Sequence, residues 1–123
     1  MSGSAAVSLT TRPGRGCTVV QVVGERDMAT EPALRGCLMR AVEDGARCIV
    51  LDLAGVRFID SSVLGTIVLT YKALQERAGR LCLAAVQPLA LRVLELTSVD
   101  RLVSIYPSVD AAEADLATPG GER

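Results

Sequence analysis

An acid and two hydroxyls stand side by side near the middle of the chain, in the stretch VRFIDSSVLG. Asp60, Ser61 and Ser62 lie between an apolar run typical of a strand and an apolar run typical of a helix. Such a junction can cap the helix, because its first backbone N–H groups lack partners and its positive end favours an anion. A cap needs only one of these side chains. The other hydroxyl is a candidate site for chemistry done by another protein, since sites in α/β folds lie at strand ends.

The segments around this junction predict an α/β domain. β-branched, alternating or continuous apolar runs predict strands at residues 7–11, 17–24, 47–53, 80–86 and 102–106. Helical spacing of apolar residues predicts helices at residues 30–44, 62–78, 88–96 and 108–116. The order is therefore ββαβαβαβα. It implies a mainly parallel central sheet, to which the opening hairpin adds an antiparallel edge, with helices on one face or on both.

Length and charge limit the classes of partner. The 123 residues fit one domain, which we place at residues 5–117 with flexible tails at 1–4 and 118–123. Lys and Arg total 13 and Asp and Glu total 14, so no general attraction to a phosphate backbone is expected, and no nucleic-acid partner. No apolar window approaches the ~18 residues of a membrane span, and the N-terminus lacks the pattern of a secretion signal. We expect no membrane partner and a cytoplasmic location.

Cysteine and histidine usage argues against catalysis by this chain alone. The four cysteines form no CxxC pair and have apolar neighbours, so we interpret them as small buried hydrophobic residues. Histidine is absent, which removes Ser-His-Asp and Cys-His catalysis and histidine-based metal sites. Neither GxGxxG nor GxxxxGK[ST] occurs in the sequence. We therefore predict no metal and no cofactor.

Taken together, the segments resemble a STAS domain of the bacterial anti-sigma-factor antagonist type. The resemblance covers about residues 5–117 and rests on GERDMAT after the hairpin, on CIVLDLAGVRFIDSSVLGTIVLTYKAL, and on LCLAAVQPLALRVLELTSVDRLVSIYPSVDAAEADL. The specific features are an apolar strand that ends in Asp-Leu, a Phe-Ile-Asp-Ser-Ser junction, and an aliphatic-Gly start to the helix. The resemblance implies a STAS-like α/β fold and a regulatory binding protein rather than an enzyme.

The resemblance also implies partners and a switch. Family proteins of this type bind an anti-sigma factor that is also an ATP-dependent serine kinase, and thereby free the sigma factor. Phosphorylation of the second residue after the acid breaks this pairing, and a metal-dependent serine phosphatase restores it. Carried over to this chain, Ser62 is the phosphorylation site. The implied partner-binding residues are Asp27, Asp60, Ser61, Ser62, Val63 and Gly65.

Two departures from the family pattern leave a variant of this function open. Val63 stands where the family usually has Gly or Ala, and Arg26 stands where it usually has an aliphatic residue before Asp27. A β-branched residue after the acceptor crowds an approaching nucleotide or partner. A degenerate antagonist that escapes modification and binds constitutively is therefore an alternative, and a weak homodimer is also left open.

Other functional classes remain as alternatives. A STAS subunit of a stressosome-like scaffold, or of a lipid or anion transporter, would share the fold without the phosphoserine switch. A receiver-like domain would use Asp52 as its acceptor, with Glu25 and Asp27 as the acidic pair. The only lysine, Lys72, follows the Asp-Ser-Ser junction, whereas receivers carry a lysine on the last strand. We expect Asp52 to bond nearby backbone N–H groups instead. A small enzyme is the remaining alternative.

Overall fold

The computed structural model describes residues 7–13, 17–24 and 30–117, so the predicted tails at 1–4 and 118–123 lie outside the described residues. The strands are β1 (Val7–Pro13), β2 (Thr18–Gly24), β3 (Cys48–Gly55), β4 (Arg80–Ala84) and β5 (Ser104–Tyr106). The helices are α1 (Thr30–Glu43), α2 (Ser61–Gln75), α3 (Pro88–Leu96) and α4 (Val109–Ala117), with a 3-10 turn, η2 (Val99–Arg101). The predicted element order is confirmed, and the sequence did not predict the turn.

One sheet holds the five strands in the order β1-β2-β3-β4-β5. Strands β2 to β5 pair in parallel, as alternating strands and helices predicted. Strand β1 pairs antiparallel with β2 along its whole length, from Val7 opposite Gly24 to Pro13 opposite Thr18. The sheet is therefore mainly parallel, and β1 forms one of its edges.

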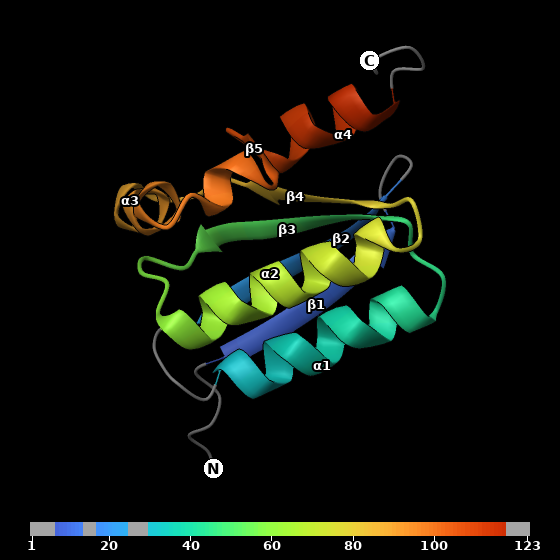
Figure 1. Ribbon diagram of the computed structural model, residues 1–123, viewed down its shortest axis with the longest axis horizontal. Helices are drawn as coiled ribbons and strands as arrows, with labels where there is room; N and C mark the ends of the chain where they lie inside the picture. Colours follow the sequence, from blue (N-terminus) through green and yellow to red (C-terminus); the bar gives the residue numbers. More distant parts are fainter. Residues whose placement is uncertain (1–6, 14–16, 25–29, 118–123) are drawn as a thin grey trace.

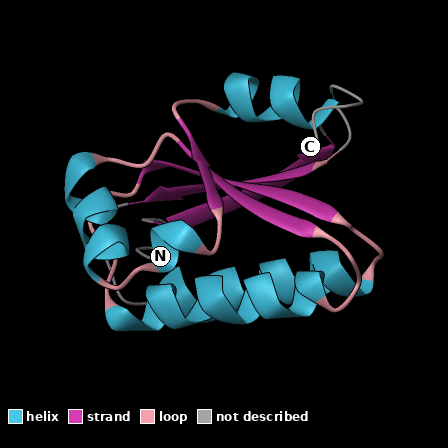
Figure 2. Ribbon diagram, turned by 45° about the horizontal axis from the view of Figure 1, so that its top comes forward, coloured by secondary structure: helices cyan, strands magenta, loops and turns pink. Residues whose placement is uncertain are grey.

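Helices cover the two faces of the sheet unequally. Helices α1 and α2 lie side by side along one face, and α4 lies on the opposite face (Figure 1). Figure 2 shows the sheet as the middle layer between them, with a further helix beyond one end of the strands. That helix is α3 in Figure 1. Of the two arrangements that the sequence allowed, the structure has helices on both faces.

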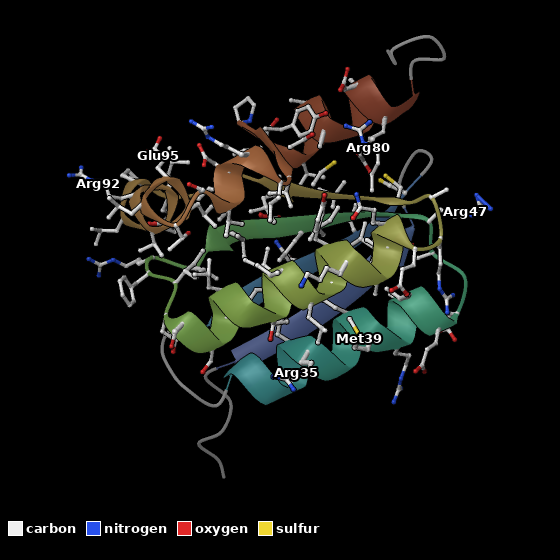
Figure 3. All side chains as sticks on the ribbon, in the orientation of Figure 1. Arg35, Met39, Arg47, Arg80, Arg92 and Glu95 are labelled. Carbon is white, nitrogen blue, oxygen red and sulfur yellow. The ribbon has the colours of Figure 1, made fainter. Side chains whose placement is uncertain are left out.

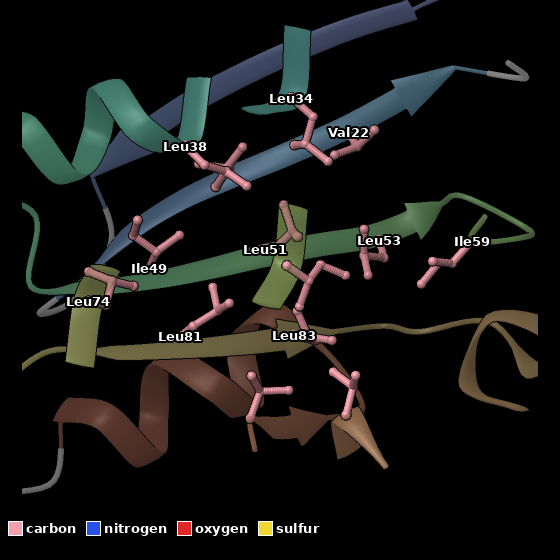
Figure 4. Close-up of a cluster of buried hydrophobic side chains, with 14 of the residues drawn as sticks. Val22, Leu34, Leu38, Ile49, Leu51, Leu53, Ile59, Leu74, Leu81 and Leu83 are labelled. Carbon is pink, nitrogen blue, oxygen red and sulfur yellow. The ribbon is translucent and has the colours of Figure 1, made fainter. Parts of the chain in front are cut away.

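The larger core lies between the sheet and the helices α1, α2 and α3 (Figure 4). Alternate residues of each strand point toward this side, because successive side chains in a strand face opposite ways. Leu51 and Leu83 of the central strands are fully buried there, as are Leu38 of α1 and Ile67 of α2. Burying a side chain of this size stabilises the fold by about 1.5–3 kcal/mol.

A smaller core lies beneath α4. It contains Val19, Val50, Cys82 and Ala84 from the sheet and Ala112 from the helix. The other face of each central strand thus also becomes buried, which explains why β3 reads as a nearly continuous apolar run.

Helices α1 and α2 end near the glycines at which the sequence pattern stops. After α1, the amide of Gly45, with φ of 100°, donates to the Val42 carbonyl at 3.0 Å. After α2, the Gly79 amide donates to the Leu74 carbonyl at 2.7 Å. A Cβ on Gly79 would lie 2.2 Å from the carbonyl oxygen of Arg47, so the two segments meet at a distance that only glycine allows.

Two side-chain hydrogen bonds join the ends of α2 and α3 to other elements of the fold. The Arg77 guanidinium donates to the Val42 carbonyl at 2.9 Å, so the segment after α2 satisfies an end carbonyl of α1. The Gln87 side-chain amide donates to the Ala54 carbonyl at 2.5 Å, which fixes the start of α3 at the end of β3. The first contact holds the C-terminal end of α2, and the second holds the strand end that leads into the junction after β3.

Candidate functional site

A short connection joins the end of strand β3 to the start of α2 at Asp60. The Val56 amide donates to the Leu53 carbonyl at 3.0 Å, which turns the chain out of the sheet. Ile59 then inserts into the larger core and is 1 % exposed, whereas Phe58 beside it is 59 % exposed. The buried side chain anchors the connection and so fixes the position of Asp60.

Asp60 is the cap of α2. Its backbone is extended, with φ of −92° and ψ of −179°, and its Oδ1 atom accepts a hydrogen bond from the Val63 amide at 2.9 Å. Its carbonyl accepts from the Leu64 amide at 3.0 Å, which is the first turn of the helix. Both the hydrogen bond and the charge at the positive helix end favour this arrangement. Helix α2 therefore begins at Ser61, one residue before the predicted start.

The hydroxyls of the next two residues do not cap the helix. Ser61 and Ser62 occupy the first and second positions of α2, and both are exposed. Neither side chain has a hydrogen-bond partner within the part of the chain that the structure describes. The backbone N–H groups at these positions have no acceptor one turn earlier in the helix. A polar group attached to either hydroxyl would stand in solvent close to these donors.

The remaining predicted site residues divide between the surface and the core. Gly65 is exposed, and a Cβ added there would meet no atom within 4 Å. Leu69, one turn further along the same side of the helix, is 43 % exposed. Val63 is half-buried and packs against the larger core, so the β-branched residue after Ser62 helps to seat the helix. Asp27 lies outside the described residues.

Exposed apolar side chains near this junction were not singled out in the sequence. Phe58 and Leu89 are both more than half exposed, and the Gln87 contact ties the helix of Leu89 to the strand end before Phe58. The chain has one phenylalanine only, and it stands next to the buried Ile59. The sequence signal was a single aromatic residue beside an aliphatic residue just before the cap. A large exposed aromatic side chain is typical of a protein contact.

Asp52 lies within β3 and bonds a nearby backbone N–H group, as the sequence predicted. Its Oδ1 atom accepts a hydrogen bond from the Ala54 amide at 3.0 Å, and its Oδ2 atom accepts from the Gln21 side chain at 3.4 Å. Lys72 lies on the exposed side of α2, not on the last strand. Glu25, like Asp27, is outside the described residues. The acid and the lysine thus do not reproduce the receiver arrangement.

The interpretation of all four cysteines as buried was wrong for three of them. Cys82 is fully buried, but Cys17, Cys37 and Cys48 are half-buried. Cys17 and Cys48 stand where strands begin, which leaves one side of the residue open, and Cys37 lies in helix α1 where it is only partly covered. No disulfide joins them, and within the described residues no group of three or more Cys, Asp or Glu is placed to hold a metal ion.

Several charged side chains of the helices lie at the surface, whereas Glu113 of α4 is buried. Arg92 and Glu95 of α3 point away from the sheet, and Arg35 lies on the outer side of α1 (Figure 3). Among the helices of the described ranges, none has the length and apolar character that a membrane crossing requires.

Comparison with known proteins gives a consistent set of relatives. An anti-sigma F factor antagonist of Paenibacillus polymyxa is 32 % identical over 94 residues, which cover 75 % of this chain and 80 % of that protein. An anti-sigma-B factor antagonist of Staphylococcus aureus is 35 % identical over 86 residues, or 70 % of this chain and 80 % of that one.

A solved structure and a family match extend this likeness to the whole domain. The crystal structure of an anti-sigma factor antagonist from Mycobacterium paratuberculosis has a TM-score of 0.82 and 30 % identity, covering 96 % of this chain and 100 % of that chain. Residues 8–112 match the STAS domain. The match includes the five strands nearly whole and the capped junction at Asp60. The chain therefore belongs to the STAS domain family.

Proposed function

We propose that this chain is an anti-sigma-factor antagonist whose switch is Ser62. With Ser62 unmodified, it binds an anti-sigma factor that is also a serine kinase, and this binding frees the sigma factor in the cytoplasm. Phosphorylation of Ser62 by that partner ends the binding, and a serine phosphatase restores it. The chain itself acts as a binding protein and not as an enzyme. The names of the relatives support the class of partner.

One observation supports a switch at the exposed hydroxyls of this junction, and the resemblance to the family selects Ser62 among them. Asp60 already supplies the helix cap through its contact with the Val63 amide, so the exposed Ser62 hydroxyl is not needed for folding. A kinase can reach an exposed hydroxyl at a helix start without unfolding the domain. Ser61 is also exposed and lies one position away, so it is the control for the site of phosphorylation.

The electrostatics of the helix start allow a phosphate within the folded domain. A phosphoserine carries about −1.5 to −2 charges near neutral pH. The free N–H groups and the dipole of α2 favour an anion there by roughly 0.3–1 kcal/mol, which offsets part of the repulsion from Asp60. The modified chain should therefore stay folded.

The phosphate should weaken the complex with the partner rather than the folded chain itself. Docking would remove water from the phosphate and from Asp60 together. A like-charge juxtaposition at an interface costs several kcal/mol, and each ~1.4 kcal/mol corresponds to a tenfold loss of affinity. A weakening of two to three decades is therefore expected from one phosphate.

The surface around Ser62 is suited to a protein partner. Gly65 and Leu69 continue along the exposed side of α2, and the exposed Phe58 lies two residues before the cap. A glycine in an exposed helix interior lets another backbone approach closely. We assign Asp60, Ser61, Ser62, Val63 and Gly65, with Asp27 from the preceding loop, to the partner contact.

The test starts with identification of the partner. Tagged wild-type protein, Ser62→Ala and Ser62→Asp are used to capture proteins from the native cytosol, and the prey are identified by mass spectrometry. The proposal expects an anti-sigma factor with a kinase domain bound to wild type and Ser62→Ala, and little of it bound to Ser62→Asp. Recovery of a transporter or a scaffold assembly instead would favour the other STAS functions.

Reconstitution with the purified partner then tests the switch. With ATP, one phosphate should be added to wild type and to Ser61→Ala, and none to Ser62→Ala. Calorimetry should give at least tenfold weaker binding for Ser62→Asp than for the unmodified wild type. Equal affinity of Ser62→Asp and Ser62→Ala would refute the switch. Binding without any phosphate transfer would identify the constitutive variant.

A further inference from the structure

Three of the four cysteines gather at one end of the sheet, on the side that α4 covers. Thr18 of β2 pairs with Ile49 of β3, so Cys17 stands next to Cys48 at the start of these strands. Cys48 pairs with Arg80 of β4, and Cys82 is two residues further along β4. Residues two apart in a strand share a face, so Cys48, Arg80 and Cys82 project to the same side.

The members of this thiol cluster (Cys17, Cys48 and Cys82) differ in access. Cys82 is 0 % exposed and packs in the smaller core with Ala112 of α4. Cys48 is half-buried, at the first position of its strand. Figure 3 shows Arg80 on the side of the sheet that carries α4. A small reagent from solvent can thus reach the Cys48 sulfur, whereas the Cys82 sulfur is buried.

The two thiols interact directly. The Cys82 thiol hydrogen-bonds to the Cys48 sulfur, and this bond, together with the nearby Arg80 guanidinium, holds the pKa of Cys48 below its usual value despite partial burial. The same hydrogen bond and burial raise the pKa of Cys82. Of the two thiols, Cys48 is therefore the one that loses its proton more readily.

We propose that Cys48 and Cys82 form a reversible oxidation site, at which hydrogen peroxide converts the two thiols into a disulfide between β3 and β4. The Cys48 thiolate attacks one peroxide oxygen, the O–O bond breaks, and the departing hydroxide takes a proton to leave as water. Cys48 becomes a sulfenic acid. The Cys82 sulfur then attacks the Cys48 sulfur, the S–O bond breaks, and a second water leaves with the Cys82 proton.

The first step prepares the second. Most of the rise in the pKa of Cys82 comes from its hydrogen bond to the Cys48 sulfur and from burial. Once Cys48 is a sulfenic acid, no thiolate remains to hold the Cys82 proton, so that thiol becomes easier to ionise. Oxidation of Cys48 thus removes one of the causes that hold the proton on Cys82, which favours attack by the Cys82 sulfur.

The disulfide would enclose the candidate phosphorylation site in a covalent loop. Residues 48–82 contain all of α2 and the junction at Ser62. Closing such a loop restricts the unfolded chain and raises the thermal midpoint of the oxidised protein. The oxidation site rests on the thiol cluster alone and does not depend on the function proposed for Ser62.

The experiment treats the full chain with hydrogen peroxide and blocks the remaining thiols with N-ethylmaleimide. Non-reducing peptide mapping should recover a Cys48–Cys82 peptide pair, and intact mass should show two maleimides on the oxidised protein against four on the reduced protein. Dithiothreitol should restore the original count. A disulfide formed by Cys37, or a stable sulfenic acid at Cys48 with no disulfide, would overturn the proposal.

Matched variants separate the two sulfurs. Cys37→Ser is the control, because Cys37 is also half-buried but lies on α1 across the sheet, and it should oxidise as wild type does. Cys48→Ser should block the disulfide. Cys82→Ala should leave a sulfenic acid at Cys48 that dimedone traps. If Cys82→Ala fails to fold, the Cys48→Ser variant and the wild-type map still decide the outcome, because any Cys82 disulfide formed without Cys48 contradicts the mechanism.

Discussion

Replacing Gly65 by alanine separates the needs of the fold from the needs of a partner. Gly65 lies within α2, and a Cβ there would meet nothing within 4 Å. Nothing in the folded domain therefore requires glycine at this position. The new methyl group would reduce the freedom of the unfolded chain and favour the helix, so Gly65→Ala should stabilise the isolated protein.

The expected gain follows from the helix propensity and the size of the domain. Glycine in an exposed helix interior is about 0.5–1 kcal/mol worse than alanine. An unfolding entropy of about 2.1 cal/mol/K per residue gives ~0.26 kcal/mol/K for 123 residues. The thermal midpoint should therefore rise by about 2–4 °C.

The control and the second readout test the reasoning in both directions. Gly36 of α1 is also exposed and also has open space for a Cβ, so Gly36→Ala should raise the midpoint by a similar amount. Calorimetric thermal scans measure both variants. Against the anti-sigma partner, an extra methyl in a close contact costs about 1–3 kcal/mol. Only Gly65→Ala should then bind more weakly, by about 5- to 150-fold at ~1.4 kcal/mol per decade. A lower midpoint for this variant, or binding equal to that of Gly36→Ala, would contradict us.

Three further predictions concern the cap, a close approach and a titrating phenol. Asp60→Ala should lower stability by about 1 kcal/mol in urea denaturation, and Asp60→Asn should recover most of it, because the amide oxygen can still cap α2. Gly79→Ala should cost about 1–3 kcal/mol, since its Cβ would meet the Arg47 carbonyl at 2.2 Å; an unchanged urea midpoint would refute that contact. Burial and the hydrogen bond to Asp115 raise the pKa of Tyr106 above 10.0, so this stabilisation is present below pH ~10 and lost above it; Tyr106→Phe should show a smaller alkaline loss than wild type.

Local signals were sufficient to predict the elements of the fold. The apolar run of β3 and the helical spacing of Leu34 and Leu38 in α1 identify their structures without knowledge of their neighbours in space. The exact ends of the helices and strands were harder to predict, because the start of α2, for example, depends on which residue caps it. Asp60, and not a serine, takes that role.

Burial depends on contacts between distant segments and was harder to predict. Thr66 and Thr70 are fully buried in α2, although both are polar. The Thr70 hydroxyl donates to the Thr66 carbonyl at 2.8 Å, so it is satisfied within its own helix and can enter the core. An apolar pattern does not count such residues. The apolar pattern also does not show that α4 would be the helix that covers the second face of the sheet.

The candidate site was predictable because its central residues are contiguous. Asp60, Ser61 and Ser62 need only the strand-to-helix junction to come together at the surface. The half-exposed Cys48 beside the buried Cys82 was not predictable, because their meeting requires β3 and β4 to pair in one particular register. Long-range pairing, rather than residue type, decides such a contact.

The single helix over the smaller core has a consequence for how the protein is made. During synthesis, the strands and α1, α2 and α3 leave the ribosome before α4 does, so the aliphatic plane around Val19 and Val50 stays bare until Val109–Ala117 has emerged. A nascent chain paused before that point would present this plane to chaperones or to other unfinished copies. Helix α4 is thus the last element of the fold to become available, and the smaller core cannot be complete without it.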